Sequence, residues 1–504
     1  MSEHPEEPLA GVKKVGFAFS TTAWLFVRLI GVVYFLAFVS CAPQITALIG
    51  EHGLLPASRF LNVLQVDLGD AKLLFAPSVF WFNSTDYFLQ TVCWGGAILS
   101  LMVVAGILAG PALLCCYLLY LSIVSVGQDF MSFQWDWLLL EAGFLALFLA
   151  RWNVFDRPFS KGTGTKERGQ PPALMIWAAR FVIFKLMIMS GLVKLTSGDT
   201  TWSSFTALNY HYLTQPLPTP LGWFAGHLPE WFQKISVLAM FFIELIAPLG
   251  IFCGRRWRFA AAALIASLQL LIAATGNYTF FNLLTIVLCV PLLDDACVLR
   301  FLPARLKSRV QVQENSSTPM PRAKKWIFSA IAVSLLTLSA TRMVGLQVPI
   351  LSSLVSPFGV SNGYGLFAVM TTARNEIIIE GSDDGLSWRE YELPYKPGDL
   401  RSAPPIVAPF QPRLDWQLWF ASLTNYSQEP WFGHLMFRLL SGSDDVLHLF
   451  SKVPFREHPP KFVRAKLYKY EFSSLADLFK TGAWWKRTYV SDYFPTASLD
   501  GPSS

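Results

Sequence analysis

Seven charged side chains fall inside or at the edges of long apolar segments, where charge is rare. They are Arg28, Asp136, Glu141, Arg180, Lys185, Lys194 and Glu244. Placing one such charge in hydrocarbon costs about 2.5 to 3.5 kcal/mol, so it normally faces a protein interior, a cavity or a counter-charge. Three of the four cations share one segment, so other helices must fold around that segment and supply carboxylates.

Two interpretations of these charges are open. In the first, six of them line a polar cavity at the outer side of a helical bundle: Arg28, Asp136, Glu141, Arg180, Lys185 and Glu244. A desolvated Lys185 or Lys194 then serves as a catalytic base, because burial favours the neutral amine.

In the second interpretation, the charges are structural. Glu141 and Glu244 form ion pairs with Arg180, Lys185 or Arg28, and these pairs fix the register of the helices. Asp136 and Lys194 lie near the ends of predicted spans, from which either side chain can reach the lipid headgroups.

A loop at 196–234 follows the segment with the three cations, and it contains Asp199, Tyr210 and His211. Histidine and aspartate can bind metal, but the HxH and HExxH spacings are missing. No GxSxG, P-loop or dinucleotide-binding motif occurs either. We therefore expect no metal and no cofactor. The loop should pack over the mouth of the bundle, with His211 hydrogen-bonded.

The composition predicts a membrane protein with several spans. Of the 504 residues, 53% are hydrophobic and 15% are charged, and the apolar residues come in blocks of membrane-spanning length. The net charge of +6 does not indicate nucleic acid, because the cations sit in short loops beside apolar segments. We expect membrane lipids, and no nucleic acid, as partners.

The apolar blocks predict a polytopic α-helical bundle of seven to nine spans within residues 22–343, after a cytoplasmic N-terminus at 1–21. The predicted spans are 22–41, 89–108, 111–126, 135–150, 173–195, 235–252, 259–274, 280–293 and 326–343. The eighth is short for a full crossing and is a candidate re-entrant segment.

The distribution of Lys and Arg predicts the orientation of the bundle. With a cytoplasmic N-terminus, seventeen cations fall in inner segments and three in outer loops. The inner ones are Lys13, Lys14, Arg151, Arg157, Lys161, Lys166, Arg168, Arg255, Arg256, Arg258, Arg300, Arg305, Lys307, Arg309, Arg322, Lys324 and Lys325, and the outer ones are Arg59, Lys72 and Lys234. By the positive-inside rule, the chain after about residue 344 lies outside the cytoplasm.

Residues 344–490 predict an extracytoplasmic β-rich, β-sandwich-like domain, followed by a flexible tail at 491–504. Short segments at 376–382, 388–393 and 464–472 are rich in β-branched and aromatic residues, and SDDG at 382–385 is a natural hairpin turn. A helix is expected at 413–424. Its Asp415, Trp416, Trp419 and Phe420 are either a surface that captures apolar client segments or part of the domain core.

Long motifs in one order identify a family resemblance. They include QWDWLLLEAGF (134–144), KLMIMSGLVKLTSGDTTW (185–202), ALNYHYLTQPLPTPL (207–221), GNYTFFNLLTIVLCVPLLDD (276–295) and PRLDWQLWFASL (412–423). The chain resembles the lipase maturation factors from about residue 22 to residue 473. The resemblance implies a membrane factor, or chaperone, that helps secreted lipases reach their active form. Its C-terminal domain would lie in the endoplasmic reticulum lumen, or outside the inner membrane of a bacterium.

The membrane half also resembles, more distantly, the helical domain of vitamin K-dependent carboxylase. That resemblance implies an alternative function, a membrane-embedded enzyme with a lysine base acting on a lipid-soluble or peptide substrate. The leading prediction is non-enzymatic assistance to secreted client proteins, with lipases as the clients that the first resemblance implies.

Overall fold

The computed structural model describes residues 19–156, 171–301, 322–346 and 354–499. Among these residues, seven helical segments are long and apolar enough to cross a membrane. They are α1 (Ser20–Cys41), α5 (Asp86–Ala105), α6 (Ala109–Val126), α8 (Ala173–Thr196), the segment Glu230–Phe252, α13 (Arg255–Thr275) and α17 (Arg322–Met343). The predicted helical bundle is confirmed, and the chain is an integral membrane protein.

Two of the predicted spans are shorter than a full crossing. Helix α7 (Gln134–Leu149) has 16 residues, and α14 (Phe281–Leu288) has 8 before a 3-10 turn at Val290–Leu292. At 1.5 Å per residue, α7 is about 24 Å long, less than the ~30 Å of hydrocarbon. Most side chains of α7 are buried, so this helix lies inside the bundle.

Helices α1 and α5 pack closely because glycine faces the partner helix. A Cβ added at Gly96 would lie 2.4 Å from the Phe38 ring, and one at Gly31 would lie 2.9 Å from Val103. Small residues let membrane helices approach each other in this way. The ring of Phe38 in turn meets Tyr120 of α6 edge-on, with centroids 5.4 Å apart.

The segment Glu230–Phe252 consists of α12 (Glu230–Phe241), a π turn at Phe242–Ile246 and a 3-10 turn at Ala247–Phe252. The remaining described helices are short. They are α2 (Ile45–Ile49), α3 (Ala57–Leu68), α4 (Lys72–Phe75), α9 (Thr200–Ser203), α10 (Leu208–Thr214), α11 (Pro220–Ala225), α15 (Asp295–Phe301), α19 (Arg413–Ala421), α20 (Pro430–Leu440), α21 (Asp444–Leu447) and α22 (Leu475–Thr481).

The C-terminal domain contains one antiparallel sheet of four strands in the order β2-β1-β3-β4. The strands are β1 (Arg374–Ser382), β2 (Arg389–Tyr391), β3 (Phe462–Phe472) and β4 (Trp485–Ala497). The predicted turn at 382–385 joins β1 to β2, which pair with Ile379 opposite Tyr391. The prediction of a β-rich domain is therefore confirmed.

Two details of the predicted domain differ from the structure. Residues 491–497, expected in the flexible tail, belong to β4, and Ala497 pairs with Val463 of β3. The edge strand β4 is largely exposed, so its sequence lacks the apolar alternation of a half-buried strand. In the described residues, α19 and α20 contact the sheet where a sandwich would have a second sheet.

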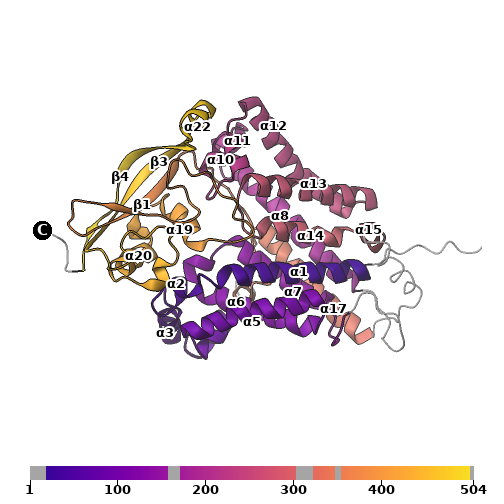
Figure 1. Cartoon of the computed structure of the whole chain (residues 1–504). Helices are drawn as coiled ribbons and strands as arrows, with labels where there is room; N and C mark the ends of the chain where they lie inside the picture. Colours follow the sequence, from indigo (N-terminus) through magenta and orange to yellow (C-terminus); the bar gives the residue numbers. More distant parts are fainter. Residues whose placement is uncertain (1–18, 157–170, 302–321, 347–353, 500–504) are drawn as a thin grey trace, which may run out of the picture.

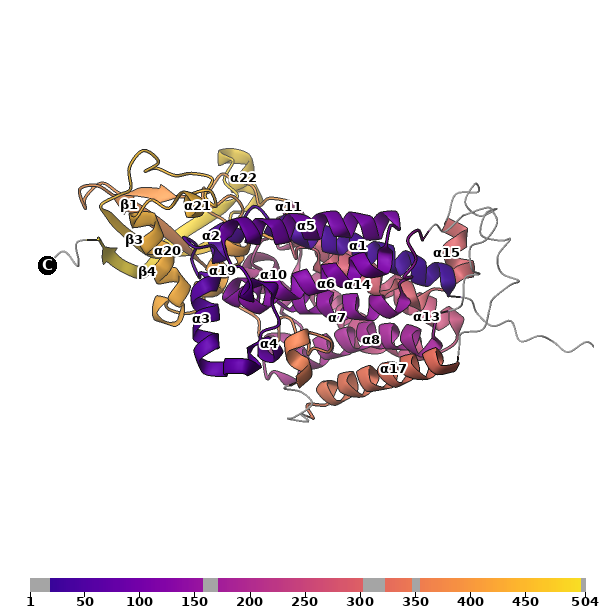
Figure 2. The same ribbon diagram turned by 90° about the horizontal axis from the view of Figure 1, so that it is seen from below.

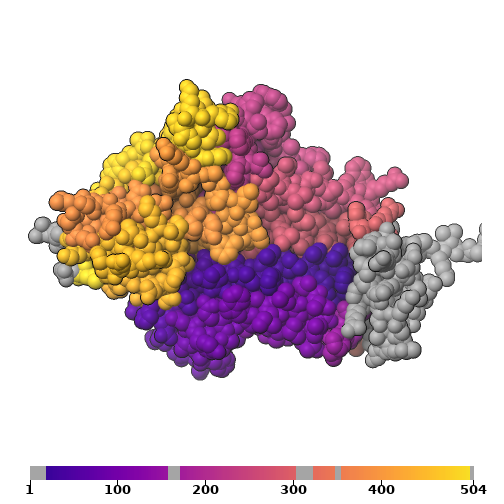
Figure 3. All heavy atoms as spheres, in the orientation of Figure 1, coloured from indigo at the N-terminus to yellow at the C-terminus, as the bar shows by residue number. Residues whose placement is uncertain are grey.

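The C-terminal domain sits at one end of the bundle, next to α2, and α15 lies at the opposite end (Figures 1 and 2). The space-filling view shows the domain directly against α1 and the helices beside it (Figure 3). Gln44, which follows α1, donates to the backbone carbonyl of Gln411 at 2.8 Å. We call the end of the bundle that carries this domain the outer end.

Candidate functional site

Lys185 of α8 and Glu141 of α7 form a fully buried ion pair. Lys185 Nζ lies 2.6 Å from Glu141 Oε1, and the two side chains are 0% and 1% exposed. The other carboxylate oxygen accepts hydrogen bonds from the backbone N–H of Asn362, at 3.1 Å, and from the hydroxyl of Tyr364. Lys185 also donates to Ser339 Oγ of α17 at 3.3 Å. The pair therefore connects three helices with the segment that leads to the C-terminal domain.

Lys194 pairs with Glu244 near the outer end of α8. Its Nζ lies 2.9 Å from each of the two carboxylate oxygens and 3.0 Å from the carbonyl oxygen of Ser190. Glu244 lies on the π turn, and such turns often occur at functional sites. The ring of Trp202 lies 5.5 Å from the ammonium group. Glu244 thus balances the charge of Lys194 within the protein, and the Lys194 side chain does not extend to the lipid headgroups.

Asp136 at the start of α7 pairs with Arg413 at the start of α19. Two guanidinium nitrogens of Arg413 each lie 3.0 Å from an oxygen of Asp136. Tyr120 also donates to this carboxylate, and Arg413 Nη1 donates to the carbonyl oxygen of Phe130 at 2.5 Å. Side-chain exposures of 1% and 0% make this a buried connection between bundle and C-terminal domain, not a contact with headgroups.

The remaining two intramembrane cations lie elsewhere in the bundle. Arg28 of α1 pairs with Asp156 at 2.6 Å. Arg180 donates to the carbonyl oxygen of Pro291 at 2.9 Å and lies 4.9 Å from the ring centroids of Phe19 and Trp177. Of the expected pairings, only that of Glu141 with Lys185 is present, and Glu244 pairs with Lys194 instead.

The structure does not combine these side chains into the expected polar cavity. They form separate ion pairs and carbonyl contacts, and the space that Glu141 and Ser339 line measures only about 10 Å³. Such a volume holds about one water molecule. This space has no room for a substrate, so the hypothesis that Lys185 is a catalytic base receives no geometric support.

The outer-loop residues hold the loop in place. Asp199 caps α9 by accepting from Thr201 N at 2.8 Å, and it accepts from Met370 N at 2.5 Å. Burial raises the pKa of the Asp199 carboxyl, but its hydrogen bonds with Met370 and Thr201 together outweigh burial and hold the pKa below its usual value. Tyr210 is half-buried in α10. Among the described residues, no cluster of three metal-ligating side chains occurs.

His211 is enclosed by aromatic side chains at the mouth of the bundle. Its Nε2 lies 3.3 Å from the Tyr278 hydroxyl, and its ring meets Phe367 edge-on with centroids 4.9 Å apart. Burial, together with the positive charge of Lys194, lowers the pKa of His211 to about 4. The imidazole is therefore neutral near pH 7 and packs as an aromatic side chain.

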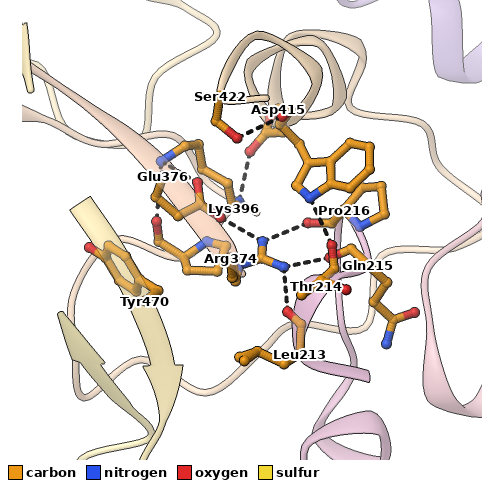
Figure 4. Close-up of polar contacts among 12 residues, drawn as sticks. Leu213, Thr214, Gln215, Pro216, Arg374, Glu376, Lys396, Asp415, Ser422 and Tyr470 are labelled. Carbon is orange, nitrogen blue, oxygen red and sulfur yellow. Dashed lines mark hydrogen bonds and ion pairs between the residues drawn. The ribbon is translucent and has the colours of Figure 1, made fainter. Parts of the chain in front are cut away.

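Arg374 of β1 forms a second connection between the domain and the bundle (Figure 4). Its guanidinium group donates to the carbonyl oxygens of Leu213, Gln215 and Pro216 at 2.9, 2.5 and 2.8 Å. Glu376 balances the charge at 2.6 Å. A single arginine thus binds three backbone carbonyl oxygens at the C-terminal end of α10 and directly after it, and this fixes the outer loop against the sheet.

The helix α19 is buried at this junction, which corrects the idea that all four of its candidate residues form a client-binding surface. Asp415, Trp416 and Trp419 are 3%, 3% and 8% exposed, whereas Phe420 is 39% exposed. Trp419 Nε1 donates to the carbonyl oxygen of Thr214 at 2.8 Å, and the Trp416 and Trp135 rings meet at 4.9 Å. The aromatic side chains bind the domain to the bundle.

Asp415 organises the segment before α19. Its Oδ1 accepts the backbone N–H groups of Tyr395 and Lys396 at 3.0 and 2.8 Å. Burial raises the pKa of this carboxyl to about 7, although the two backbone hydrogen bonds act in the opposite direction. Its role is therefore structural.

Arg413, Arg374 and Asp156 were not among the residues singled out from the sequence. Arg413 and Arg374 each begin a regular element, which is a common position for a surface charge. Their partners are 277 and about 160 residues away. Asp136 could have indicated that a residue such as Arg413 is needed, because this acid lies at the end of a predicted span and has no cation near it in the sequence.

Comparison with known proteins agrees with this architecture. Residues 21–300 match the family model for the lipase maturation factor transmembrane domain, and residues 360–495 match that for the lipase maturation factor C-terminal domain. Lipase maturation factor 2 of Gallus gallus is 35% identical, with 95% of this chain and 82% of that protein covered. The corresponding values are 35%, 95% and 83% for lipase maturation factor 2 of Homo sapiens, and 34%, 95% and 90% for lipase maturation factor 1 of Bos taurus. No solved structure matches the chain. The chain belongs to the lipase maturation factor family.

Proposed function

We propose that this chain is a membrane-bound maturation factor that assists secreted lipases, with its C-terminal domain outside the cytoplasm. The names of its relatives supply the client class. The observation that carries the proposal is the junction itself, at which buried Arg413 and Arg374 join the domain to the outer end of the bundle. Bundle and domain together offer one continuous surface to a client.

The structure favours a binding role over chemistry. Lys185 and Lys194, the two candidate bases, are both held in close ion pairs. A base for catalysis needs a substrate within hydrogen-bond reach. The space beside the Lys185 pair is too small for one.

The distribution of charge supports the proposed orientation. Arg255 at the start of α13 pairs with Asp294 at 2.5 Å, next to α15 and opposite the C-terminal domain (Figure 1). By the positive-inside rule, basic side chains at that end support its proposed location in the cytoplasm. The C-terminal domain then faces the lumen of the endoplasmic reticulum or the periplasm.

Glycosylation tests the orientation. Asn425 begins an Asn-Tyr-Ser triplet and is exposed on the C-terminal domain, whereas Asn277, in another such triplet, is 2% exposed. Expressed in an endoplasmic reticulum membrane, the chain should gain a glycan that Asn425→Gln removes and Asn277→Gln does not. Protection of the C-terminal domain from cytoplasmic but not from luminal reagents would agree, and labelling of the domain by a cytoplasmic reagent would contradict the orientation.

Co-expression tests the function. Cells that lack their own maturation factor would receive this chain with a secreted lipase or with an unrelated secreted protein. We expect the specific activity of the secreted lipase to rise, and the yield of the unrelated protein to stay the same. No change in lipase activity, with the full-length chain present in the membrane, would refute the proposed client class.

A further inference from the structure

A groove of about 540 Å³ lies at the junction of bundle and C-terminal domain. Its walls come from residues between Asp129 and Trp135, residues between Gly365 and Thr371, and the stretch from Trp416 to Glu429. We call it the outer groove. Its volume is within the range of ligand pockets, about 300 to 1,000 Å³, so it can hold a few side chains but no folded domain.

Six aromatic side chains line the outer groove, and several of them pack against one another. Phe133 stacks on Trp135 with centroids 4.7 Å apart, and it meets Trp416 at 5.8 Å and Phe420 at 6.1 Å. At the rim, Val369 is 67% exposed and Phe420 39%. Rigid aromatic side chains are the usual anchors for an apolar partner. The groove thus has buried aromatic rings in its floor and exposed apolar side chains at its rim.

Two carboxylates also line the outer groove, and in the described part of the chain neither has a basic partner. Glu429 accepts hydrogen bonds from Thr424 at 3.1 Å and from the Trp431 indole at 2.8 Å. Burial and the nearby charge of Glu429 raise the pKa of the Asp129 carboxyl. Asp129 is exposed and Glu429 is half-buried. Because neither carboxylate has a basic partner in the described residues, both present negative charge to an occupant of the groove.

We propose that the outer groove binds an extended, apolar segment of a client that carries a lysine or arginine. The aromatic walls fit the apolar side chains, and the two carboxylates fit the cation. The same charge disfavours anionic lipid headgroups. This inference rests on the proposed function, because it supplies the place where a maturation factor holds an incompletely folded client.

Peptide binding to the full-length protein in nanodiscs tests the proposal. Three fluorescent peptides of about eight residues share an apolar sequence and carry Lys, Gln or Glu at the centre. We expect the Lys peptide to bind at least about tenfold more tightly than the Glu peptide. Asp129→Asn should reduce this preference severalfold and leave the affinity for the Gln peptide unchanged.

Two further variants test the apolar walls. Phe420→Ser should weaken the binding of all three peptides about tenfold. Val369→Ser, at an exposed position without a packing role, should weaken it severalfold even if Phe420→Ser fails to fold. Phe479→Ser is the matched control, because Phe479 is 83% exposed on α22, outside the groove.

Equal affinities for the three peptides, or an effect of Phe479→Ser as large as that of Val369→Ser, would overturn the proposal. So would displacement of the Lys peptide by added phospholipid, which would make the groove a lipid site. Lipase co-expression separates this failure from failure of the proposed function. If Asp129→Asn and Val369→Ser support lipase secretion as well as the wild type, the groove proposal fails alone; if the wild type gives no secretion while the peptides bind, the proposed client class fails alone.

Discussion

Removing one partner of the buried pair of Asp136 and Arg413 should loosen the C-terminal domain from the bundle. In Asp136→Asn, the guanidinium of Arg413, whose side chain is 1% exposed, loses its only carboxylate partner among the described residues. Leaving one charge of a buried pair uncompensated costs about 3 to 5 kcal/mol. We expect the free energy of opening the junction to fall by about 3 kcal/mol.

Hydrogen exchange measures this opening. The backbone N–H groups of Trp416 and Ser422, bonded to Pro412 O at 3.1 Å and Leu418 O at 3.0 Å, report on α19. A loss of about 3 kcal/mol corresponds to exchange roughly 100-fold faster. The double variant Asp136→Leu with Arg413→Met should recover most of the protection, because apolar replacement of a buried pair is often close to neutral.

The control is the exposed pair of Lys234 and Glu230, 45% and 59% exposed at 2.7 Å. Glu230→Gln should change exchange little, because exposed pairs contribute about 0 to 1 kcal/mol. If Asp136→Asn accelerates exchange in α19 no more than Glu230→Gln does, the view of this pair as the connection between bundle and domain is wrong.

Three other predictions concern single positions. The pKa of His211 in the folded protein is about 4, below the unfolded value of about 6.5. The stability that depends on neutral His211 is therefore fully present above pH 6.5 and is lost as the pH falls toward 4. When thermal unfolding is measured from pH 7 to pH 4.5, the free energy of unfolding should fall by up to about 3 kcal/mol in the wild type but not in His211→Gln, and equal pH profiles would contradict this. Lys185→Met should lower stability by about 3 to 5 kcal/mol, and Lys185→Met with Glu141→Gln should recover part of that loss together with lipase secretion; a stable double variant without secretion would instead indicate chemistry at Lys185. Gly143→Ala would place a Cβ 2.1 Å from the Tyr34 hydroxyl, so its unfolding temperature should drop, by contrast with Gly95→Ala, where nothing lies within 4 Å.

The membrane spans could be predicted because one property decides them. A long apolar stretch such as 22–41 has no alternative to a membrane helix, and the structure places α1 at Ser20–Cys41. The strands at 376–382 and 464–472 were found from residue types that favour strands, since β1 contains three consecutive isoleucines and β3 is rich in tyrosine and phenylalanine. Strand β4 was not predicted, and its C-terminal part was assigned to the flexible tail, because most of its side chains face water and Pro495 interrupts it, as an edge strand permits.

The pairing of the charges could be predicted only in part. Glu141 and Lys185 lie in the middle of their helices, so each needed a partner at a similar depth, and their pair is one of the several pairings that the structural interpretation allowed. Asp136 and Lys194 lie near helix ends, where either water or protein can satisfy a charge. Their partners depend on how α19 and the π turn at Glu244 pack, which the local sequence does not encode.

The fixed attachment of the C-terminal domain has an energetic consequence for any partner. A domain on a loose linker loses rotational and translational freedom when a ligand bridges it to the membrane part, and that loss weakens binding. Here Arg374 and Arg413 have already immobilised the domain during folding. The entropy cost of fixing the two halves together therefore arises during folding and not during binding. A short segment with few contacts can then bind at their boundary and dissociate quickly.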